Sequence, residues 1–265
     1  MTVRIIESKQ NARLKELRRS LAYPARVPGG LAGIEGPNLI EEALRSGLRI
    51  DCVFVAQDAQ HLLDALPFPA ETEVLLLPAE LLHSALATET PQPIAALIRL
   101  PAFSWEHILG DLRQAPLLLL LAGLQDPGNL GTILRSAEAF GATGILSLPG
   151  TVSAWNPKAV RASAGSLFRL PLLSVAPEEC FIRLREAGVK ILTTAMHGAQ
   201  PAHRVNLAAP VALLIGNEGN GVPPELAAQA DGAITIQCPG PVESLNAAVA
   251  TGVLLYEAAR QRGMR

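Results

Sequence analysis

The sequence predicts an α/β protein whose C-terminal part contains a mostly parallel sheet. From residue 117 onward, short and continuously apolar segments alternate with segments of helical period. Strands that are apolar throughout are typical of a sheet covered by helices on both faces. Apolar residues make up 49% of the 265 residues, which is enough to fill the core of one large domain or two ordinary ones.

The first hundred residues also alternate between helix and strand and predict a small α/β unit. The expected helices are 11–21, 37–46, 58–66 and 78–87, and the expected strands are 52–55, 74–77 and 94–100. Residues 33–38 look like a turn-rich entry to a helix, with proline at its start. We expect a domain over 1–100, a linker over 101–115 bordered by prolines, and a second domain over 116–265.

The second domain shows the more regular alternation. The expected strands are 117–121, 144–148, 190–194, 211–215 and 233–236, and the expected helices are 129–140, 157–164, 177–187, 223–229 and 244–261. Ligands of parallel sheets bind beyond the carboxyl ends of the strands. The loops that follow these strands are therefore the expected location of any chemistry.

Composition excludes several classes of protein. The longest aliphatic run, 117–121, is far shorter than the roughly 20 residues of a membrane helix, and residues 1–10 lack an apolar signal region. Cys52, Cys180 and Cys238 are odd in number and far apart, and the histidines are scattered. We therefore expect a cytoplasmic protein with reduced thiols, no metal and no membrane attachment.

The net charge of −2 conceals an uneven distribution. Residues 1–26 carry seven basic and two acidic side chains, a charge of +5, so the remainder carries −7. The expected helix 11–21 has leucines on one stripe and cations elsewhere. Taken alone, this pattern is more often a solvated helix face than a nucleic-acid contact.

Three loops combine glycine with polar side chains. In the first, Asn129 begins a helix and Arg135 projects away from its apolar face; alone, these are a helix cap and a surface cation. The second contains Glu218 among glycines, with a spacing that makes dinucleotide binding a weak interpretation. In the third, Ser244 is a credible cap of a helix that is apolar on all sides, which suggests a dimer contact.

Together and in this order, the three loops resemble the motifs of the SpoU/TrmH family of RNA ribose methyltransferases in the SPOUT superfamily. Asn129-x-Gly131-x-x-x-Arg135 resembles motif 1, Gly216-x-Glu218-x-x-Gly221 motif 2, and Ser244-Leu-Asn246 motif 3. Residues 34–43 are similar to the first residues of the RNA-binding α/β domain that often precedes the methyltransferase domain in this family. Gln237-Cys238-Pro239 and Val222 depart from the common pattern at apolar positions only.

The resemblance implies methylation of a ribose 2′-hydroxyl in structured RNA, with 23S ribosomal RNA as the expected substrate. It also implies a deep trefoil knot, a homodimer, and S-adenosylmethionine bound largely through backbone groups. The implied cofactor-binding residues are Thr194, Ala195, Met196, Gly216, Ile236 and Leu245.

The resemblance also implies residue roles. Arg135 would be the catalytic residue, for which the family suggests a general base; because arginine is effectively always protonated, we expect it to clamp a phosphate and stabilise the developing alkoxide instead. Asn129 and Asn246 would position the ribose or Arg135, Ser244 would shape the site, and Glu218 would orient Arg135 or a loop. For an RNA enzyme, the basic helix becomes an expected RNA contact through Arg13, Lys15, Arg18 and Arg19.

Three alternatives stay open at this point. They are a transfer-RNA 2′-O-methyltransferase, a catalytically silent RNA-binding relative, and a doubly wound nucleotide-dependent enzyme. The intact polar motif positions argue against the silent relative, and the missing GxGxxG and P-loop argue against the nucleotide-dependent enzyme.

Overall fold

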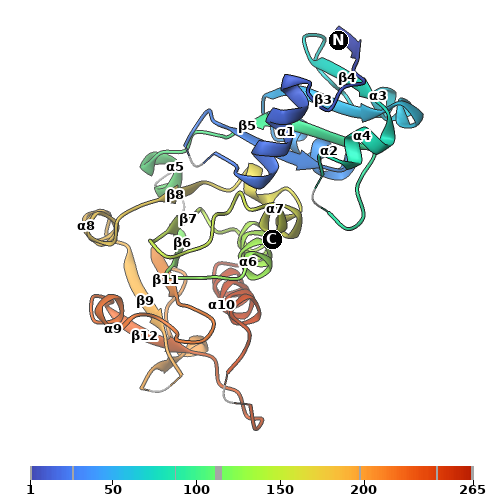
Figure 1. The fold of residues 1–265 in the computed structure, drawn as a ribbon. Coiled ribbons are helices and arrows are strands. Elements are labelled where there is room, and N and C mark those ends of the chain that lie inside the picture. The colour runs from blue at the N-terminus through green and yellow to red at the C-terminus, as the bar shows by residue number, and fades with distance from the viewer. Residues whose placement is uncertain are drawn as a thin grey trace. The chain divides into compact units, whose positions relative to one another are not determined.

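The computed structural model describes residues 2–25, 27–86, 88–110, 115–196, 198–242 and 244–263. The chain forms two compact units (Figure 1). The N-terminal unit contains Met1–Ala102 together with Trp155–Arg169, and the C-terminal unit contains Phe103–Ala154 and Leu170–Arg265. In the described part of the chain, no helix is long and apolar enough to cross a membrane.

The N-terminal unit contains a five-stranded mixed sheet in the order β1-β4-β3-β5-β2. Strands β1, β4 and β3 are parallel, whereas β5 is antiparallel to both of its neighbours. The strands are β1 (Thr2–Ile5), β2 (Leu31–Glu35), β3 (Ile50–Ala56), β4 (Glu73–Leu77) and β5 (Ile94–Arg99). The helices are α1 (Ala12–Ala22), α2 (Pro37–Arg45), η1 (Gln57–Ala59), α3 (His61–Ala65), α4 (Ala79–His83), α7 (Pro157–Ser163) and η2 (Ser166–Phe168).

Helix α1 forms where the sequence predicts it and for the predicted reason. Asn11 caps the helix by accepting hydrogen bonds from the backbone N–H groups of Arg13 and Leu14. Leu14 and Leu17 are fully buried, so the leucine stripe packs into the core and the cations lie on the remaining faces. Burial of each leucine side chain contributes about 1.5–3 kcal/mol to folding.

The C-terminal unit contains a seven-stranded sheet in the order β10-β12-β9-β11-β6-β7-β8, and every strand pair is parallel. Its strands are β6 (Leu117–Leu121), β7 (Gly144–Ser147), β8 (Leu172–Ser174), β9 (Lys190–Thr194), β10 (Gln200–Pro201), β11 (Val211–Ile215) and β12 (Gly232–Thr235). Its helices are α5 (Trp105–Leu109), α6 (Pro127–Ala139), α8 (Pro177–Glu186), η3 (Ala202–Arg204), α9 (Pro224–Ala227) and α10 (Ala247–Gln261). The predicted α/β class with a mostly parallel sheet is therefore confirmed.

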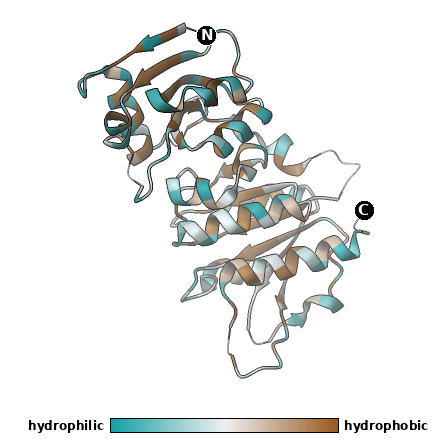
Figure 2. Ribbon diagram, turned by 90° about the vertical axis from the view of Figure 1, so that its right-hand side faces the viewer, coloured by the Kyte–Doolittle hydropathy of each residue, from teal (hydrophilic) through white to brown (hydrophobic). Residues whose placement is uncertain are grey.

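The apolar strands of this sheet build the core of the C-terminal unit. All five residues of β6 and all five of β11 are buried. Figure 2 shows the strands as hydrophobic ribbons, while the helices carry both hydrophobic and hydrophilic residues. Helices α6 and α10 pack against each other. This arrangement gives the physical reason why continuously apolar segments form the strands here.

Several helix boundaries differ from the sequence-based expectation. Helix α6 begins at Pro127 and is capped by Asp126, so Asn129 lies in its first turn and does not cap it. Helix α10 begins at Ala247 and is capped by Asn246, which corrects the expectation for Ser244. In both cases several neighbouring side chains could have served as the cap, and the fold of the preceding loop determines which one does.

The expected strands missed three short ones at sheet edges and one that contains glycine. The edge strand β1 is exposed along its whole length, and β8 and β10 are only three and two residues long. Strand β2 contains Gly33, where an ideal Cβ atom would lie 2.6 Å from the side chain of Leu21. These strands lack the continuous apolar signal that identified the others. The expected helices 58–66 and 78–87 are shorter than predicted, with a single 3-10 turn before α3.

The structure departs from the expected domain boundaries at two places. The expected linker 101–115, of which 111–114 lie outside the described residues, contains helix α5, whose Ile108 is fully buried in the C-terminal core. Residues 155–169 belong to the N-terminal unit, where α7 packs against β2.

The end of α10 is bound to the beginning of the central sheet. The guanidinium of Arg262 donates to the carbonyl oxygens of Pro116 at 3.0 Å, Leu207 at 2.9 Å and Ala209 at 2.8 Å, and also to that of Ala115. Partial burial lowers the pKa of Arg262 from its ordinary value. Four carbonyls accept hydrogen bonds from this cation, which has no carboxylate partner in the described part of the chain.

Candidate active site

The three polar loops meet at one edge of the C-terminal sheet. Strands β12, β9, β11 and β6 are neighbours and parallel, so their carboxyl ends lie at the same edge. The loop 122–126 follows β6, the loop 216–223 follows β11, and the loop 236–246 follows β12. This topology brings residues of three distant sequence segments together, as the sequence predicted.

Glu218 joins the first two loops. Its Oε2 accepts from the backbone N–H of Gln125 at 3.1 Å, and its Oε1 accepts from the backbone N–H of Asp126 at 3.0 Å. The side-chain Nδ2 of Asn129 also donates to Oε1, at 3.2 Å. One carboxylate therefore holds the entry to α6 with three hydrogen bonds from separate donors.

These hydrogen bonds change the ionisation of Glu218. Partial burial, the largest contribution, would raise the pKa of this carboxyl group, but the hydrogen bonds from the backbone of Asp126, Gln125 and Glu218 itself and from Asn129 outweigh it. The pKa of Glu218 is lowered as a result, so the group is ionised at neutral pH and acts as a hydrogen-bond acceptor.

Asn129 connects this junction to the third loop. The Nδ2 of Asn246 donates to the Oδ1 of Asn129 at 3.0 Å. The Oδ1 of Asn246 in turn accepts from the backbone N–H groups of Ala248 and Val249 and so caps α10. A continuous chain of hydrogen bonds thus runs from Glu218 through Asn129 to Asn246, which we call the Glu218–Asn246 chain.

Gly216 is required by close packing of its own loop. The backbones of Asn217 and Gly221 exchange two hydrogen bonds, at 2.8 and 2.9 Å, and close a tight loop. An ideal Cβ atom on Gly216 would lie 2.1 Å from the carbonyl carbon of Gly221. Asn217 also donates to the carbonyl of Gly123 at 2.9 Å. This glycine accordingly lets the chain turn back on itself, a reason that the sequence pattern did not reveal.

Arg135 lies on α6, the helix whose first turn contains Asn129, and its side chain is exposed. Among the described residues it has no hydrogen-bond or ion-pair partner. Glu218, in contrast, bonds the loop at the start of α6 and not the guanidinium of Arg135. The guanidinium is therefore free to bind an anion such as a phosphate.

Ser244 is exposed and makes no hydrogen bond to a described residue. It lies two positions before the Asn246 cap, at the exit of the third loop. Ser244 is thus close in sequence to Asn246, but no hydrogen bond to a described residue joins it to the Glu218–Asn246 chain.

The implied cofactor-binding residues lie at the same sheet edge. Thr194 ends β9, Gly216 follows β11, and Ile236 follows β12. Ala195 donates its backbone N–H to Ile234, and the hydroxyl of Thr194 donates to the carbonyl of Leu214 at 3.1 Å.

Met196 and Leu245 complete this implied set. The side chain of Met196 is 61% exposed, and that of Leu245 is partly buried. Their backbone N–H groups have no partner among the described residues. An edge with free backbone donors and an exposed apolar side chain fits a ligand that is recognised mainly through the backbone.

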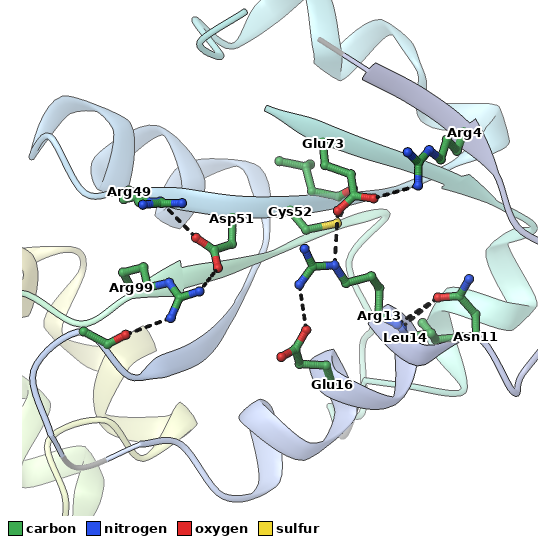
Figure 3. A network of polar contacts seen from close by, with 12 residues as sticks. Arg4, Asn11, Arg13, Leu14, Glu16, Arg49, Asp51, Cys52, Glu73 and Arg99 are labelled. Atoms are coloured by element: carbon green, nitrogen blue, oxygen red, sulfur yellow. Dashed lines mark hydrogen bonds and ion pairs between the residues drawn. The ribbon is translucent and has the colours of Figure 1, made fainter. Parts of the chain in front are cut away.

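The basic residues of α1 differ in their surroundings. Arg13 is half-buried; its Nε is 3.1 Å from a carboxylate oxygen of Glu73, and its Nη1 is 2.8 Å from Glu16 (Figure 3). These contacts, with the hydrogen bond to Glu16 the largest, raise the pKa of Arg13. Arg13 is therefore held within the N-terminal unit by two carboxylates.

The other three cations of α1 are exposed. Arg18 donates to the carbonyl of Ser84 at 3.3 Å, while Lys15 and Arg19 have no described side-chain partner. Arg26, which contributes to the charge of +5, lies outside the described residues.

Two site residues escaped the sequence analysis. Asp126 caps α6 by accepting from the backbone N–H of Asn129 at 2.7 Å, and Asn217 ties the second loop to the first. The dipeptide Asp126-Pro127 is a recognisable cap signal, because proline favours the first position of a helix. In the described part of the chain there is no group of three or more side chains that could hold a metal.

Comparison with known proteins agrees with this geometry. Residues 116–256 match the SpoU rRNA methylase family, and residues 11–96 match the MRM3-like substrate binding domain. A curated relative from Bacillus subtilis, the 23S rRNA (guanosine(2553)-2′-O)-methyltransferase RlmP, is 33% identical over 253 residues, which cover 95% of this chain and 97% of that protein. The chain belongs to the SpoU rRNA methylase family.

Solved structures extend the similarity over both units. The SpoU methyltransferase AviRb from Streptomyces viridochromogenes, in complex with its cofactor S-adenosylmethionine, has a TM-score of 0.83 and 31% identity; the match covers 96% of this chain and 98% of that one. An S-adenosylmethionine-bound rRNA methyltransferase from Sinorhizobium meliloti has a TM-score of 0.84 and 29% identity. The predicted family, fold class and enzyme class are confirmed.

Proposed function

We propose that this protein transfers a methyl group from S-adenosylmethionine to a ribose 2′-oxygen of 23S ribosomal RNA. The observation that carries the proposal is the Glu218–Asn246 chain, which joins the three loops of a SpoU-family domain at one sheet edge. The relatives support the substrate, since RlmP from Bacillus subtilis is named as a 23S rRNA methyltransferase.

Ribosomal RNA is favoured over transfer RNA by the extent of the similarity. The AviRb structure matches 96% of this chain, including the N-terminal unit. The tRNA-modifying TrmH/SpoU enzyme of Aquifex aeolicus matches only 56% of it, with a TM-score of 0.50. Residues 11–96 of the N-terminal unit match a substrate-binding domain.

S-adenosylmethionine fits the edge formed by the loops after β9, β11 and β12. Thr194, Ala195, Met196, Gly216, Ile236 and Leu245 would hold it. When bound, it supplies an electrophilic methyl group on a sulfonium. The backbone N–H groups of Met196 and Leu245, which have no partner among the described residues, are donors for its polar groups.

Arg135 is proposed to bind the phosphate beside the target ribose and to stabilise the 2′-oxygen as its proton leaves. Asn129 and Asn246 each retain one amide hydrogen that the Glu218–Asn246 chain does not use, and these donors would orient the ribose. Ser244 would shape the same site. Glu218 is a positioning residue, because it acts through the loop at the start of α6 and through Asn129.

The exposed cations Lys15, Arg18 and Arg19 are proposed to contact RNA phosphates, which give affinity without reading sequence. Arg13, which the sequence placed in the same group, makes two ion pairs within its unit. We expect it to orient α1 more than to bind phosphate.

We propose a homodimer that uses α10. Val249, Val253 and Tyr256 recur at helical spacing on this helix and are 53%, 41% and 49% exposed. Such an apolar stripe is typical of a surface that is covered in solution. The deep trefoil knot and the cytoplasmic location are further parts of the proposal; the latter follows from ribosomal RNA as substrate in bacteria.

The function is tested with 23S RNA isolated from a strain that lacks the gene. Incubation with purified protein and tritiated S-adenosylmethionine should label the RNA, and mass spectrometry should place the methyl group on a ribose. Transfer only to tRNA would overturn the substrate. Cofactor binding without transfer to either RNA would favour the catalytically silent relative.

The role of Arg135 is tested with two substitutions. Arg135→Ala should lower kcat at least 100-fold and leave the Kd for S-adenosylmethionine unchanged, because the guanidinium acts only on RNA. Arg135→Lys keeps the charge and loses the fork, so it should also be strongly impaired. Near-normal turnover by the alanine variant would refute the assignment, and substantial activity of the lysine variant would refute a bidentate clamp.

A further inference from the structure

The N-terminal unit contains a polar pocket that lies apart from the Glu218–Asn246 chain. Its volume is about 770 Å³, and it is lined by 35–39, by 88–90 with Gln92, and by Arg161 and Ala164 of the α7 segment. All of these residues belong to the same compact unit. The volume lies within the range of about 300–1,000 Å³ that is typical of pockets for small ligands.

Glu35 supplies a carboxylate acceptor to this pocket. The residue as a whole is 7% exposed. Its Oε1 accepts from the hydroxyl of Thr88 and from the backbone N–H of Gln92, each at 2.8 Å, which uses both lone pairs of that oxygen. Its Oε2 has no hydrogen bond to a described residue. Glu35 lines the pocket, so this second oxygen can accept a hydrogen bond from a ligand N–H.

The same pocket offers donors for one negative charge. Arg161 is exposed, and its side chain has no hydrogen-bond or ion-pair partner among the described residues. Helix α2 begins at the pocket with Gly36, which has no side chain to cap it, and Pro37. The first-turn N–H groups of Asn38 and Leu39 cannot bond within the helix and are available to an anion.

An acceptor for N–H groups beside donors for a phosphate matches a nucleotide with an amino-bearing base. The exocyclic amines of adenine, guanine and cytosine have two N–H donors each, whereas uracil has no such amine and offers only its single ring N3–H. The exposed carboxylate of Glu89 also lines the pocket. This carboxylate repels the doubly charged phosphate of a free nucleoside monophosphate more strongly than the singly charged phosphodiester of an RNA chain. The pocket therefore favours a nucleotide that is part of RNA.

We propose that this pocket binds one amino-bearing nucleotide of the RNA substrate, with the base on Glu35 and the phosphate at Arg161 and the start of α2. The inference rests on the proposed function and assigns a second contact for the same RNA. The base would be unpaired, because a pocket takes up a base edge only when that base is outside a duplex.

Substitutions at both ends of the pocket test the proposal. Arg161→Ala should raise the KM for unmethylated 23S RNA about tenfold, with kcat within twofold and an unchanged Kd for S-adenosylmethionine. The dependence of RNA binding on salt should also become weaker: the slope of log K for RNA against log salt concentration should become less negative by about 1. Glu35→Gln should raise the KM by a similar factor. Matched controls are Arg45→Ala and Glu41→Gln, which alter an exposed ion pair on α2 outside the pocket.

Chemical probing identifies the base. Bound wild-type protein should protect one base of 23S RNA from kethoxal or dimethyl sulfate, which react with the edges of guanine, adenine and cytosine. Glu35→Gln should lose that protection, and Glu41→Gln should keep it. If Glu35→Gln does not fold, Arg161→Ala decides the question, since Arg161 is exposed. Protection that persists in a folded Glu35→Gln variant would overturn the base contact.

Two further outcomes separate the possible errors. If wild-type protein methylates no ribosomal RNA, the proposed function is wrong. If wild-type protein is active and Arg161→Ala keeps the wild-type KM and salt slope, the pocket assignment is wrong. Micromolar binding of 5′-GMP or 5′-AMP, measured without RNA and abolished by Glu35→Gln, would show that the pocket binds a free nucleotide and would overturn the RNA assignment.

Discussion

Replacing Glu218 with glutamine removes a charge and one acceptor from the point where the first two loops are joined. In the native site, Oε2 accepts from Gln125 and Oε1 from Asp126. A glutamine can keep only one of these bonds, because its amide nitrogen would face the other backbone N–H. A hydrogen bond to a charged group contributes about 1.5–3 kcal/mol. Glu218 is exposed, so solvent weakens the effect and we expect a loss of about 1–2 kcal/mol.

Thermal unfolding and methyl transfer measure this prediction. The Tm of the C-terminal unit should fall by roughly 2–8 °C, at about 2–4 °C per kcal/mol for a unit of this size. The kcat should fall about tenfold or more, because Asn129 loses the acceptor that orients it. Glu225→Gln, which changes an exposed glutamate on α9, is the matched control.

The difference between wild type and Glu218→Gln should depend on pH. The folded pKa of Glu218 is lowered, so its stabilising contribution is complete above the unfolded pKa of about 4.3 and is lost as the pH falls through the folded pKa. The Tm difference should therefore be constant above about pH 5.5 and shrink below about pH 4. An unchanged Tm and kcat at pH 7, or a difference that does not shrink in acid, would refute the reasoning.

Three other substitutions or reactions follow from the geometry. Arg262→Ala should lower the free energy of unfolding by about 2–4 kcal/mol, measured in urea, because four carbonyls lose their donor. Gly216→Ala should cost about 2–3 kcal/mol and weaken S-adenosylmethionine binding in calorimetry, because the added Cβ would overlap the backbone of Gly221. At pH 8, iodoacetamide should label Cys238 first, because burial raises the pKa values of Cys52 and Cys180 to about 12.

Each of these predictions has a defined control. Arg204→Ala changes an exposed arginine and should leave the urea midpoint unchanged; an equal loss would contradict the role of Arg262. The control for Gly216→Ala is Gly240→Ala, because a Cβ atom at Gly240 would meet no neighbouring atom within 4 Å. Gly263 is unsuitable because its φ of +71° disfavours alanine. Denaturation in urea should expose all three thiols, and rapid native labelling of Cys52 would contradict its burial.

The sequence predicted the elements whose signal is strong and local. The run of leucines in β6 is typical of a strand buried on both faces, and the positions of Asn129 and Glu218 beyond the carboxyl ends of β6 and β11 follow from a parallel sheet. The edge strand β1 escaped because its residues are exposed and the strand with which it pairs, β4, is far away in sequence. Pairing between distant strands leaves no periodic signal in either one.

The details of the site depend on contacts that no spacing reveals. Ser244 and Asn246 are both good caps, and only the folded third loop selects Asn246. Arg13 reads as one more cation of α1, yet Glu73 of β4 and Glu16 make it an internal ion-pair partner. The pocket of Glu35 and Arg161 joins segments that lie in two different regions of the sequence, so neither residue could be singled out before the fold was known.

The bonds of Arg262 to the carbonyls of Ala115 and Pro116 carry a consequence for synthesis of the chain. They connect the residues just before β6, the first strand of the C-terminal unit to be translated, with the end of α10, its last helix. A ribosome must therefore make every residue from 115 to 262 before this closure can form. Contacts of such long sequence separation are slow to form. The N-terminal unit has most of its sequence within its first 102 residues, so its sheet can assemble while the active site is still being translated.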